Sequence, residues 1–297
     1  MLNMLADRTG PDPVVMVLPA HDEEATVGDV VRRAPREVLG HPVLVLVVDD
    51  GSGDGTAALA RAAGASVRSL GRNRGLGAAV RVGLAWAVER RAAAVAFLDA
   101  DGEYAPEELD VLVAPILDGR ADYVIGSRFA GLPRDMRPHR WVGNRVLTLG
   151  MTVLVRRWGV RGLSDGQSGY RALSPGAAAD AEIVHDFNYA QVLTLDLVAK
   201  GYRYAEVPIS YRFRQHGRSF VRLGPYLRRV LPAIWRELRT PSATGAAAAV
   251  AQTADPQRVR PNMYGTSART SAVSGPGSAS ANAASKASDA DLAIPSP

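Results

Sequence analysis

The stretch Val95-Ala-Phe-Leu-Asp99-Ala-Asp101-Gly-Glu103-Tyr joins a run of apolar residues directly to a group of acids. The apolar run has the length and aliphatic character of a buried parallel strand. Ligands of open α/β sheets bind at the carboxyl ends of such strands. Neighbouring carboxylates repel each other unless a cation lies between them, and hard oxygen ligands suit Mg²⁺ or Mn²⁺. We therefore expect Asp99 and Asp101 to hold a metal that holds a diphosphate.

An isolated Asp-x-Asp has a simpler interpretation, which is a solvated turn that leads into a helix. Pro106 and Glu107 follow the acids, and both residue types are typical of the first turn of a helix. For this motif alone the simpler interpretation is favoured, so the rest of the chain has to decide between the two.

The composition limits the class of protein. The chain has 297 residues, 47% of them hydrophobic and 22% charged, which is typical of a soluble globular protein with a substantial core. It contains no cysteine, which excludes disulfides, thiolate metal sites and cysteine nucleophiles. The net charge of +5 fits anionic substrates, an anionic membrane surface or nucleic acid without choosing among them. There is no basic motif interleaved with aromatic residues, so we do not expect nucleic acid as a partner.

No apolar run approaches the roughly 20 residues that span a bilayer. Residues 1–13 lack the charged and then apolar layout of a signal peptide. We therefore predict a cytoplasmic protein, with peripheral contact at the inner face of the membrane left open.

The spacing of apolar residues predicts strands that alternate with helices, which is typical of βαβ units. The expected fold is a single α/β domain with a mostly parallel sheet and helices on both faces. In the first half, strands are expected at 14–18, 44–48, 66–70 and 94–98, and helices at 26–38, 57–63, 78–91 and 106–117. In the second half, strands are expected at 122–126, within 165–173 and at 204–209, and helices at 142–158, 188–200 and 223–238.

The ends of the chain differ in composition from this domain. Residues 1–12 are predicted to be a flexible leader and residues 13–240 the folded domain. Residues 241–297 are rich in Ala, Ser, Gly and Pro, and they cannot bury enough apolar surface to offset the entropy of ordering, so we predict a disordered tail.

Two glycine-rich loops follow the early strands. The first, from Asp49-Asp50 to Thr56, resembles a calcium loop, but the twelfth position counted from Asp50 is Arg61 instead of a carboxylate. A nucleotide-binding loop and a helix-capping turn both remain open for it. The second, 73–77, is not Gly-x-Gly-x-x-Gly and does not follow the first strand, which disfavours a dinucleotide fold.

Arg128, Arg171 and Arg214 are expected in separate loops, each just past an apolar run. A guanidinium suits phosphate oxygens, although any one of these arginines alone is more easily read as a surface charge. Together with the acids, they imply a neutralised diphosphate. The five histidines lack the close spacing of metal-binding motifs.

Taken in order, seven motifs resemble family-2 glycosyltransferases of the GT-A fold, and in particular the dolichyl- or polyprenyl-phosphate sugar synthases. The resemblance extends from about residue 14 to 220. The motifs are residues 18–23, 47–56, 73–78, 99–102, 126–128, 165–171 and 206–209.

This resemblance implies roles for particular residues. Pro19 and Glu23 are expected to contact the nucleoside, with His21 in place of a usual aromatic residue. Asp50, beside Val48, is expected to bind the base or ribose.

The same resemblance implies that Asp99, Ala100 and Asp101 bind the diphosphate and the metal. Glu103 stands where the family often has Gln, and its added negative charge is expected to tighten binding of Mg²⁺ or Mn²⁺. Arg128 matches the arginine of the family's Gly-Thr/Ser-Arg motif.

In the last loop, Arg214 matches a phosphate-binding arginine of the mannose synthases. Phe220 stands where those enzymes have a lysine, and Arg218 or Arg222 is the expected substitute. This departure weakens the inference that the present chain uses the same substrate as the mannose synthases.

The resemblance implies a metal-dependent inverting glycosyltransferase, with Asp99, Asp101 and Arg128 in catalysis. It would move a hexose from a nucleotide diphosphate sugar to polyprenyl phosphate, with GDP-mannose as the first donor and UDP-glucose as the second. A lipid phosphate is already an anion and needs no strong base. The alternative acceptor is a hydroxyl of a glycan or small molecule, for which Asp165 is the predicted general base. Asp165 is equally well explained as a turn residue, and a non-catalytic nucleotide-binding scaffold is the third hypothesis.

Membrane contact is expected from basic amphipathic segments. Residues 223–235 have Leu, Val, Ile and Trp on one side and arginines on the other, and the helix at 142–158 is similar. The alternative for each is a helix packed on the domain with an exposed basic face.

Overall fold

The structure is a computed structural model that describes residues 10–130, 138–160, 162–184, 186, 189–212 and 232. The predicted flexible leader over 1–12, the helix at 223–238 and the disordered tail over 241–297 lie outside these residues, apart from residues 10–12 and 232. In chain order the elements are β1 (Val14–Ala20), α1 (Val27–Arg33), β2 (Glu37–Val38), β3 (His41–Asp49), α2 (Thr56–Ala62), β4 (Ser66–Ser69), α3 (Leu76–Glu89), β5 (Ala94–Phe97), the 3-10 helix η1 (Pro106–Glu108), α4 (Leu109–Leu117), β6 (Tyr123–Ser127), α5 (Pro138–Val155), the 3-10 helix η2 (Arg156–Trp158), β7 (Arg171–Leu173), α6 (Pro175–Asp180), α7 (Ala190–Ala199) and β8 (Tyr204–Pro208).

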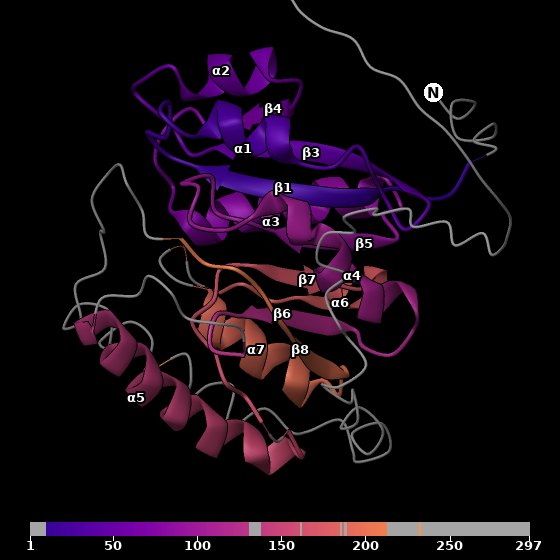
Figure 1. The fold of residues 1–297 in the computed structure, drawn as a ribbon, viewed down its shortest axis with the longest axis vertical. Helices are drawn as coiled ribbons and strands as arrows, with labels where there is room; N and C mark the ends of the chain where they lie inside the picture. Colours follow the sequence, from indigo (N-terminus) through magenta and orange to yellow (C-terminus); the bar gives the residue numbers. More distant parts are fainter. Residues whose placement is uncertain are drawn as a thin grey trace, which may run out of the picture. The chain divides into compact units, whose positions relative to one another are not determined.

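One sheet joins the two halves of the fold (Figure 1). Its order is β2-β3-β1-β5-β7-β6-β8, and β4 pairs with β3. Strands β4, β3, β1 and β5 are parallel, as the alternation of strands and helices predicts. The second half is mixed, because the three-residue strand β7 runs antiparallel to both β5 and β6.

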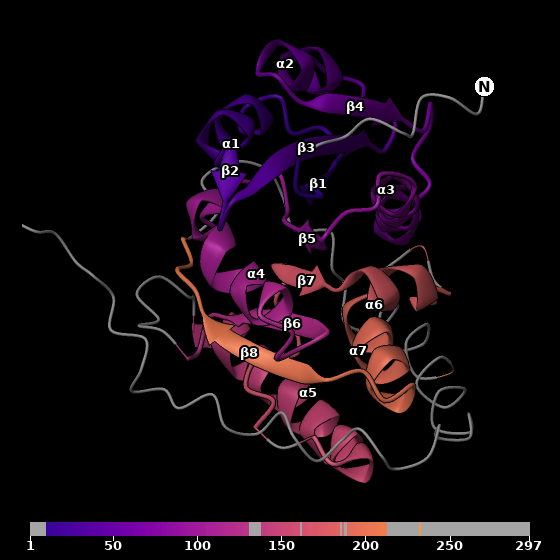
Figure 2. The ribbon, with the colours of Figure 1, turned by 90° about the vertical axis from the view of Figure 1, so that its right-hand side faces the viewer.

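Helices cover both faces of the sheet, as predicted, with α1 and α4 on one face and α3, α6 and α7 on the other (Figure 2). The alternation of side chains along β1 explains how one strand serves both layers. Met16 and Leu18 pack in the cluster with α1 and α4, whereas Val15 and Val17 pack in the cluster with α3. The sheet is therefore apolar on both sides.

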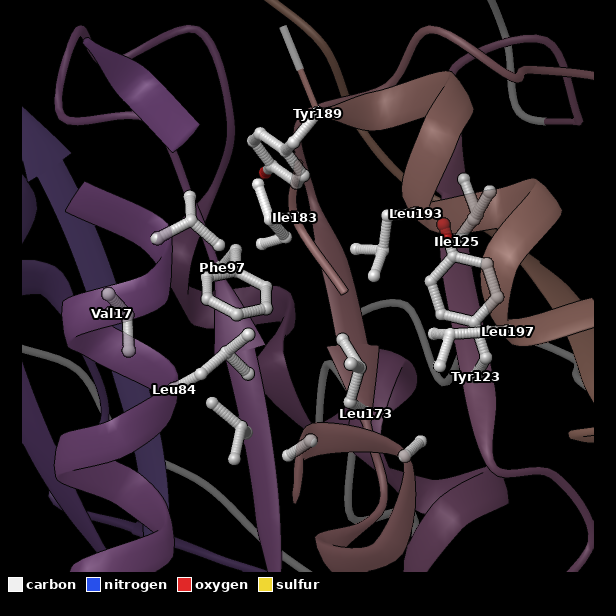
Figure 3. Packing of buried hydrophobic residues seen from close by; sticks show 14 of the residues in the cluster. Val17, Leu84, Phe97, Tyr123, Ile125, Leu173, Ile183, Tyr189, Leu193 and Leu197 are labelled. Atoms are coloured by element: carbon white, nitrogen blue, oxygen red, sulfur yellow. The ribbon is translucent and has the colours of Figure 1, made fainter. Parts of the chain in front are cut away.

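The apolar cluster on the α3 side of the sheet joins the first half of the chain to the second. Figure 3 shows Phe97 of β5 among Leu84 of α3, Ile183 and Tyr189. The rings of Phe97 and Tyr189 meet edge to face, with centroids 6.2 Å apart. This packing fixes the end of β5, which is where the acids begin.

The register places the carboxyl ends of three strands at one edge of the sheet. Ala20 of β1 pairs with Asp49 of β3, and Val17 of β1 pairs with Phe97 of β5. The loops that follow these strands carry the predicted site residues, so they meet at the same edge.

Candidate active site at the carboxyl edge of the sheet

The acids that follow β5 sit in a turn with alternating burial. Leu98 and Ala100 are buried, whereas Asp99 and Asp101 are partly exposed. The hydroxyl of Thr26 donates to the Ala100 carbonyl at 2.8 Å, and the Glu103 amide donates to Asp101 Oδ1 at 3.0 Å. The turn is therefore anchored through its backbone, with both aspartates at its outer side.

The loop before β7 packs against Asp99. The amide of Gly169 donates to the buried Tyr104 hydroxyl at 2.8 Å. A Cβ atom added at Gly169 would lie 2.5 Å from Asp99 Oδ2, closer than non-bonded atoms approach. A side chain at position 169 would therefore have to displace the Asp99 carboxylate.

Asp165, in the same loop as Gly169, forms an ion pair with Arg128. Arg128 Nε lies 2.7 Å from Asp165 Oδ2, and Arg128 Nη2 lies 2.8 Å from Asp165 Oδ1. The side chains are 8% and 0% exposed. Burial alone would lower the pKa of the Arg128 guanidinium, but the hydrogen bonds to Asp165 and the charge of its carboxylate outweigh it and raise that pKa. Arg128 is therefore a fixed positive charge.

The geometry of Asp165 corrects its predicted role as a general base. Both of its carboxylate oxygens accept hydrogen bonds from Arg128, and Oδ1 also accepts from the Gln167 amide at 3.3 Å. A buried carboxylate bonded in this way is not placed to take a proton from a substrate hydroxyl. The alternative interpretation, a residue that holds the turn, describes the contacts of Asp165.

A second carboxylate, Glu206 of β8, supports this pair. Its Oε1 accepts from the amides of Ser164 at 2.9 Å and Asp165 at 3.2 Å, and from the Tyr204 hydroxyl at 2.5 Å. Burial raises the pKa of the Glu206 carboxyl. The sequence places Glu206 in a family motif without assigning it a role. Its role becomes visible only in the structure, where β8 brings it against Ser164 and Asp165.

Arg171 was predicted to reach phosphate from a loop, and this prediction is wrong. The residue lies in β7 and is 0% exposed. Its guanidinium donates to the carbonyls of Ser168 at 2.7 Å, Ala190 at 2.7 Å and Gly166 at 2.9 Å. It also contacts the hydroxyls of Tyr123 and Thr194. Its donors hold the loop and α7 together, so Arg171 is part of the core.

The residues predicted to bind the nucleoside gather where β1 and β3 end. Pro19 and Val48 are paired in register and buried. The Asp50 carboxylate accepts from the amides of Arg74 at 2.7 Å and Gly75 at 2.8 Å, which ties the second glycine-rich loop to the first. The two loops also approach closely at Gly51, where a Cβ atom would lie 2.3 Å from the backbone of Arg72.

His21 and Glu23 lie on the loop after β1. The amide of Glu23 donates to the Thr56 hydroxyl at 2.8 Å, which joins this loop to the start of α2. His21 Nδ1 is buried without a hydrogen-bond partner among the described residues, and Nε2 lies 3.7 Å from Asp22 Oδ2. The loops after β1 and β3 thus form one connected surface. Arg214 and Arg218 lie outside the described residues.

The donor set at Asp99 and Asp101 fits a magnesium or manganese ion that is also held by a diphosphate. Such ions commonly use one or two protein carboxylates together with substrate phosphates. Within the described residues, no group of three His, Cys, Asp or Glu side chains is placed to hold a metal. The predicted set of three ligands, Asp99, Asp101 and Glu103, is therefore not assembled within the described residues. Two carboxylates remain for the ion.

Comparison with known proteins gives three findings. The family described as glycosyl transferase family 2 matches residues 15–172. The chain is 33% identical over 217 residues to the polyprenol monophosphomannose synthase of Mycolicibacterium smegmatis, covering 69% of this chain and 79% of that protein. It is 34% identical over 192 residues to the undecaprenyl-phosphate mannosyltransferase of Micrococcus luteus, covering 59% of this chain and 74% of that protein.

Among solved structures, the glucosyl-3-phosphoglycerate synthase of Mycobacterium tuberculosis is similar in fold. Its complex with Mn²⁺, uridine-diphosphate and phosphoglyceric acid matches with a TM-score of 0.63 at 24% identity, covering 78% of this chain and 80% of that chain. At this identity the likeness supports the fold alone.

Proposed function

The chain belongs to glycosyl transferase family 2, and from that premise we propose that it moves a hexose from a nucleotide diphosphate sugar to a polyprenyl phosphate at the inner face of the membrane. The predicted GT-A fold and glycosyltransferase class are confirmed. The names of two relatives favour mannose as the sugar, so GDP-mannose is the first donor. UDP-glucose is the second.

The turn after β5 is the proposed diphosphate site. Asp99 and Asp101 would hold Mg²⁺ or Mn²⁺, and the bound ion supplies neutralisation of the charge on the leaving diphosphate. Thr26 fixes the turn through the Ala100 carbonyl, and Gly169 leaves room for the Asp99 carboxylate. Burial raises the pKa of the Tyr104 phenol far above its usual range, so its hydroxyl stays neutral beside Asp99.

The burial of Asp165 and its pairing with Arg128 are the observation on which we base the choice of acceptor. A hydroxyl acceptor needs a general base, whereas a lipid phosphate brings an oxygen that is already an anion. The carboxylate that the sequence nominates as the base is buried and bonded to Arg128. The acceptor oxygen would attack the anomeric carbon on the face opposite the diphosphate, which inverts the configuration.

Transfer can be measured directly. Purified protein is incubated with Mn²⁺, a short-chain polyprenyl phosphate, and labelled GDP-mannose or UDP-glucose, and the lipid phase is assayed for sugar. We expect labelled lipid from the wild type and none from the D101N variant. Absence of lipid-linked sugar from every donor tested would remove the proposal, and unchanged cellular function in D101N would favour a non-catalytic scaffold.

A further inference from the structure

Helix α5 has an apolar face that no other described element covers. Thr148, Met151 and Val155 are buried against the domain. On the opposite side, Val146, Leu149 and Val153 are 64%, 65% and 60% exposed. Spacings of three and four residues place them in one stripe along the helix. Large aliphatic side chains in a contiguous exposed stripe are typical of a surface that meets a partner.

The charges beside this stripe are all positive. Arg145, Arg156 and Arg157 are exposed. Arg145 precedes Val146 on α5, and Arg156 and Arg157 follow the last turn of α5 in η2. Residues 138–158 contain no Asp or Glu. The face therefore has an aliphatic centre and cationic flanks.

The opposite side of α5 is attached to the proposed active site. The Gly166 amide donates to the Thr148 hydroxyl at 3.3 Å, and the Thr152 hydroxyl donates to the Leu163 carbonyl at 3.1 Å. The guanidinium carbon of Arg145 lies 5.2 Å from the ring centre of Phe129, the residue after Arg128. A surface that α5 contacts is therefore brought next to the loop that carries Asp165.

We propose that the exposed face of α5 docks onto an anionic phospholipid surface. Helices of this type lie in the membrane interface, with aliphatic side chains at the boundary of the acyl chains and arginines on the lipid phosphates. The sequence predicted membrane contact for this helix and for 223–235, and apart from residue 232 the second segment lies outside the described residues. Among the described residues no helix is long and apolar enough to cross a bilayer. The inference rests on the proposed function, since a polyprenyl acceptor stays in the membrane.

A second copy of the chain fits this face less well. A symmetric contact brings the same surface of both copies together. The arginines of one α5 would then face those of the other, with no acid on either helix to neutralise them. An anionic lipid surface supplies the missing charge.

The test uses the full chain and vesicles of phosphatidylcholine with or without phosphatidylglycerol. The variant V146Q/L149Q/V153Q removes the stripe and keeps good helix formers. The matched control, L39Q/L59Q/V88Q, replaces three aliphatic residues that are exposed on other elements. R156Q/R157Q tests the charge and leaves Arg145 on Phe129.

We expect the wild type and the control to sediment with vesicles containing phosphatidylglycerol. The α5 variant is expected to partition at least about tenfold less, since three aliphatic side chains no longer enter the interface. R156Q/R157Q is expected to lose the preference for phosphatidylglycerol. Equal partitioning of the α5 variant and the wild type would overturn the proposal.

Light scattering and transfer assays separate the other outcomes. A wild-type dimer that the α5 variant converts to a monomer would show that a second copy covers the face, which also overturns the proposal. Transfer to a short-chain, water-soluble lipid phosphate is expected to be equal in the wild type and the α5 variant. If the wild type transfers no sugar but binds vesicles through α5, the proposed function fails and the docking surface stands.

Discussion

Arg128 donates to the carboxylate of Asp165 from both its backbone amide and its guanidinium, so Asp165 is bound to the backbone and the side chain of the same residue. The pair links the end of β6 to the loop before β7, which are 37 residues apart in the chain. Because the pair is buried, neither partner can recover water when the other is lost. The pair fixes the position of the loop, and its net contribution to the free energy of unfolding is expected to be small.

The first prediction concerns removal of one partner. Asp165→Asn keeps the shape of the side chain but leaves the Arg128 guanidinium buried without a counter-charge. We expect the free energy of unfolding to fall by about 3–5 kcal/mol, measured by urea denaturation.

The double variant R128M/D165L serves as the control for this interpretation. We expect it to be more stable than D165N, because neither side chain then carries a buried charge. A double variant that is less stable than D165N would show that the pair contributes net stability.

The second prediction concerns the space that Gly169 leaves for Asp99. Gly169→Ala places a methyl group 2.5 Å from the present position of Asp99 Oδ2, so the carboxylate has to move. We expect Mn²⁺-dependent binding of a nucleoside diphosphate to weaken by at least about tenfold, measured by calorimetry. Stability is expected to change little, because the atom that has to shift is the end of a flexible side chain.

Gly166→Ala is the matched control in the same loop. Its Cβ atom would meet Leu163 and Met151 at ordinary contact distances of 3.6–3.7 Å. Weakening of Mn²⁺-dependent binding to the same extent in both variants would argue against a specific role of the contact between Gly169 and Asp99.

The features that the sequence predicted well depend on local information. The strand that ends at Phe97 is recognisable because an apolar run stops at polar residues, and the same holds for β1 and β3. Parallel strands end at one sheet edge, which is enough to bring the loops after β1, β3 and β5 together.

The errors concern contacts between distant parts of the chain. Arg171 follows a loop in the sequence, yet its guanidinium is buried by partners 19–48 residues away, including Ala190 and Tyr123. Asp165 is likewise occupied by a partner 37 residues away. The antiparallel strand β7 has only three residues, too few for a pattern of alternation to give its direction.

The third prediction concerns the metal. In the wild type, a nucleoside diphosphate with Mn²⁺ is expected to raise the thermal midpoint, and chelation with EDTA is expected to remove the increase. Ligand at 100 times its Kd stabilises a protein by about 2.7 kcal/mol. We expect Asp101→Asn to abolish this stabilisation and to lower the transfer rate by about 10²–10³-fold.

Asp118→Asn is the control, because Asp118 is an exposed acid paired with Arg120 on the surface. It is expected to keep the Mn²⁺-dependent increase. The same increase in D101N as in the wild type would contradict a role for Asp101 in metal binding.

The last prediction concerns pH and Glu206. Burial raises the pKa of Glu206 in the folded protein above its ordinary value of 4.5. As the pH rises above that value, the unfolded chain loses this proton first, so the contribution of Glu206 to the free energy of unfolding falls until the folded pKa is passed. The E206Q variant lacks this term. In acid the protonated carboxyl and the amide each offer one acceptor oxygen to Ser164 and Tyr204, so the stability of the wild type relative to E206Q is expected to be highest there and to fall as the pH rises.

Urea unfolding of both proteins between pH 4.5 and 7.5 measures this change, with a slope of at most about 1.4 kcal/mol per pH unit. Glu107→Gln provides a control of opposite sign. The hydrogen bond from Arg33 lowers the pKa of Glu107 below its ordinary value of 4.5, so the wild type gains stability over E107Q as the pH rises toward that value, and this pair is compared below the pH range used for Glu206. A stability of the wild type relative to E206Q that stays constant or rises with pH would mean that Glu206 is already ionised in the fold, and the loop that carries Asp165 would then be held by a buried anion.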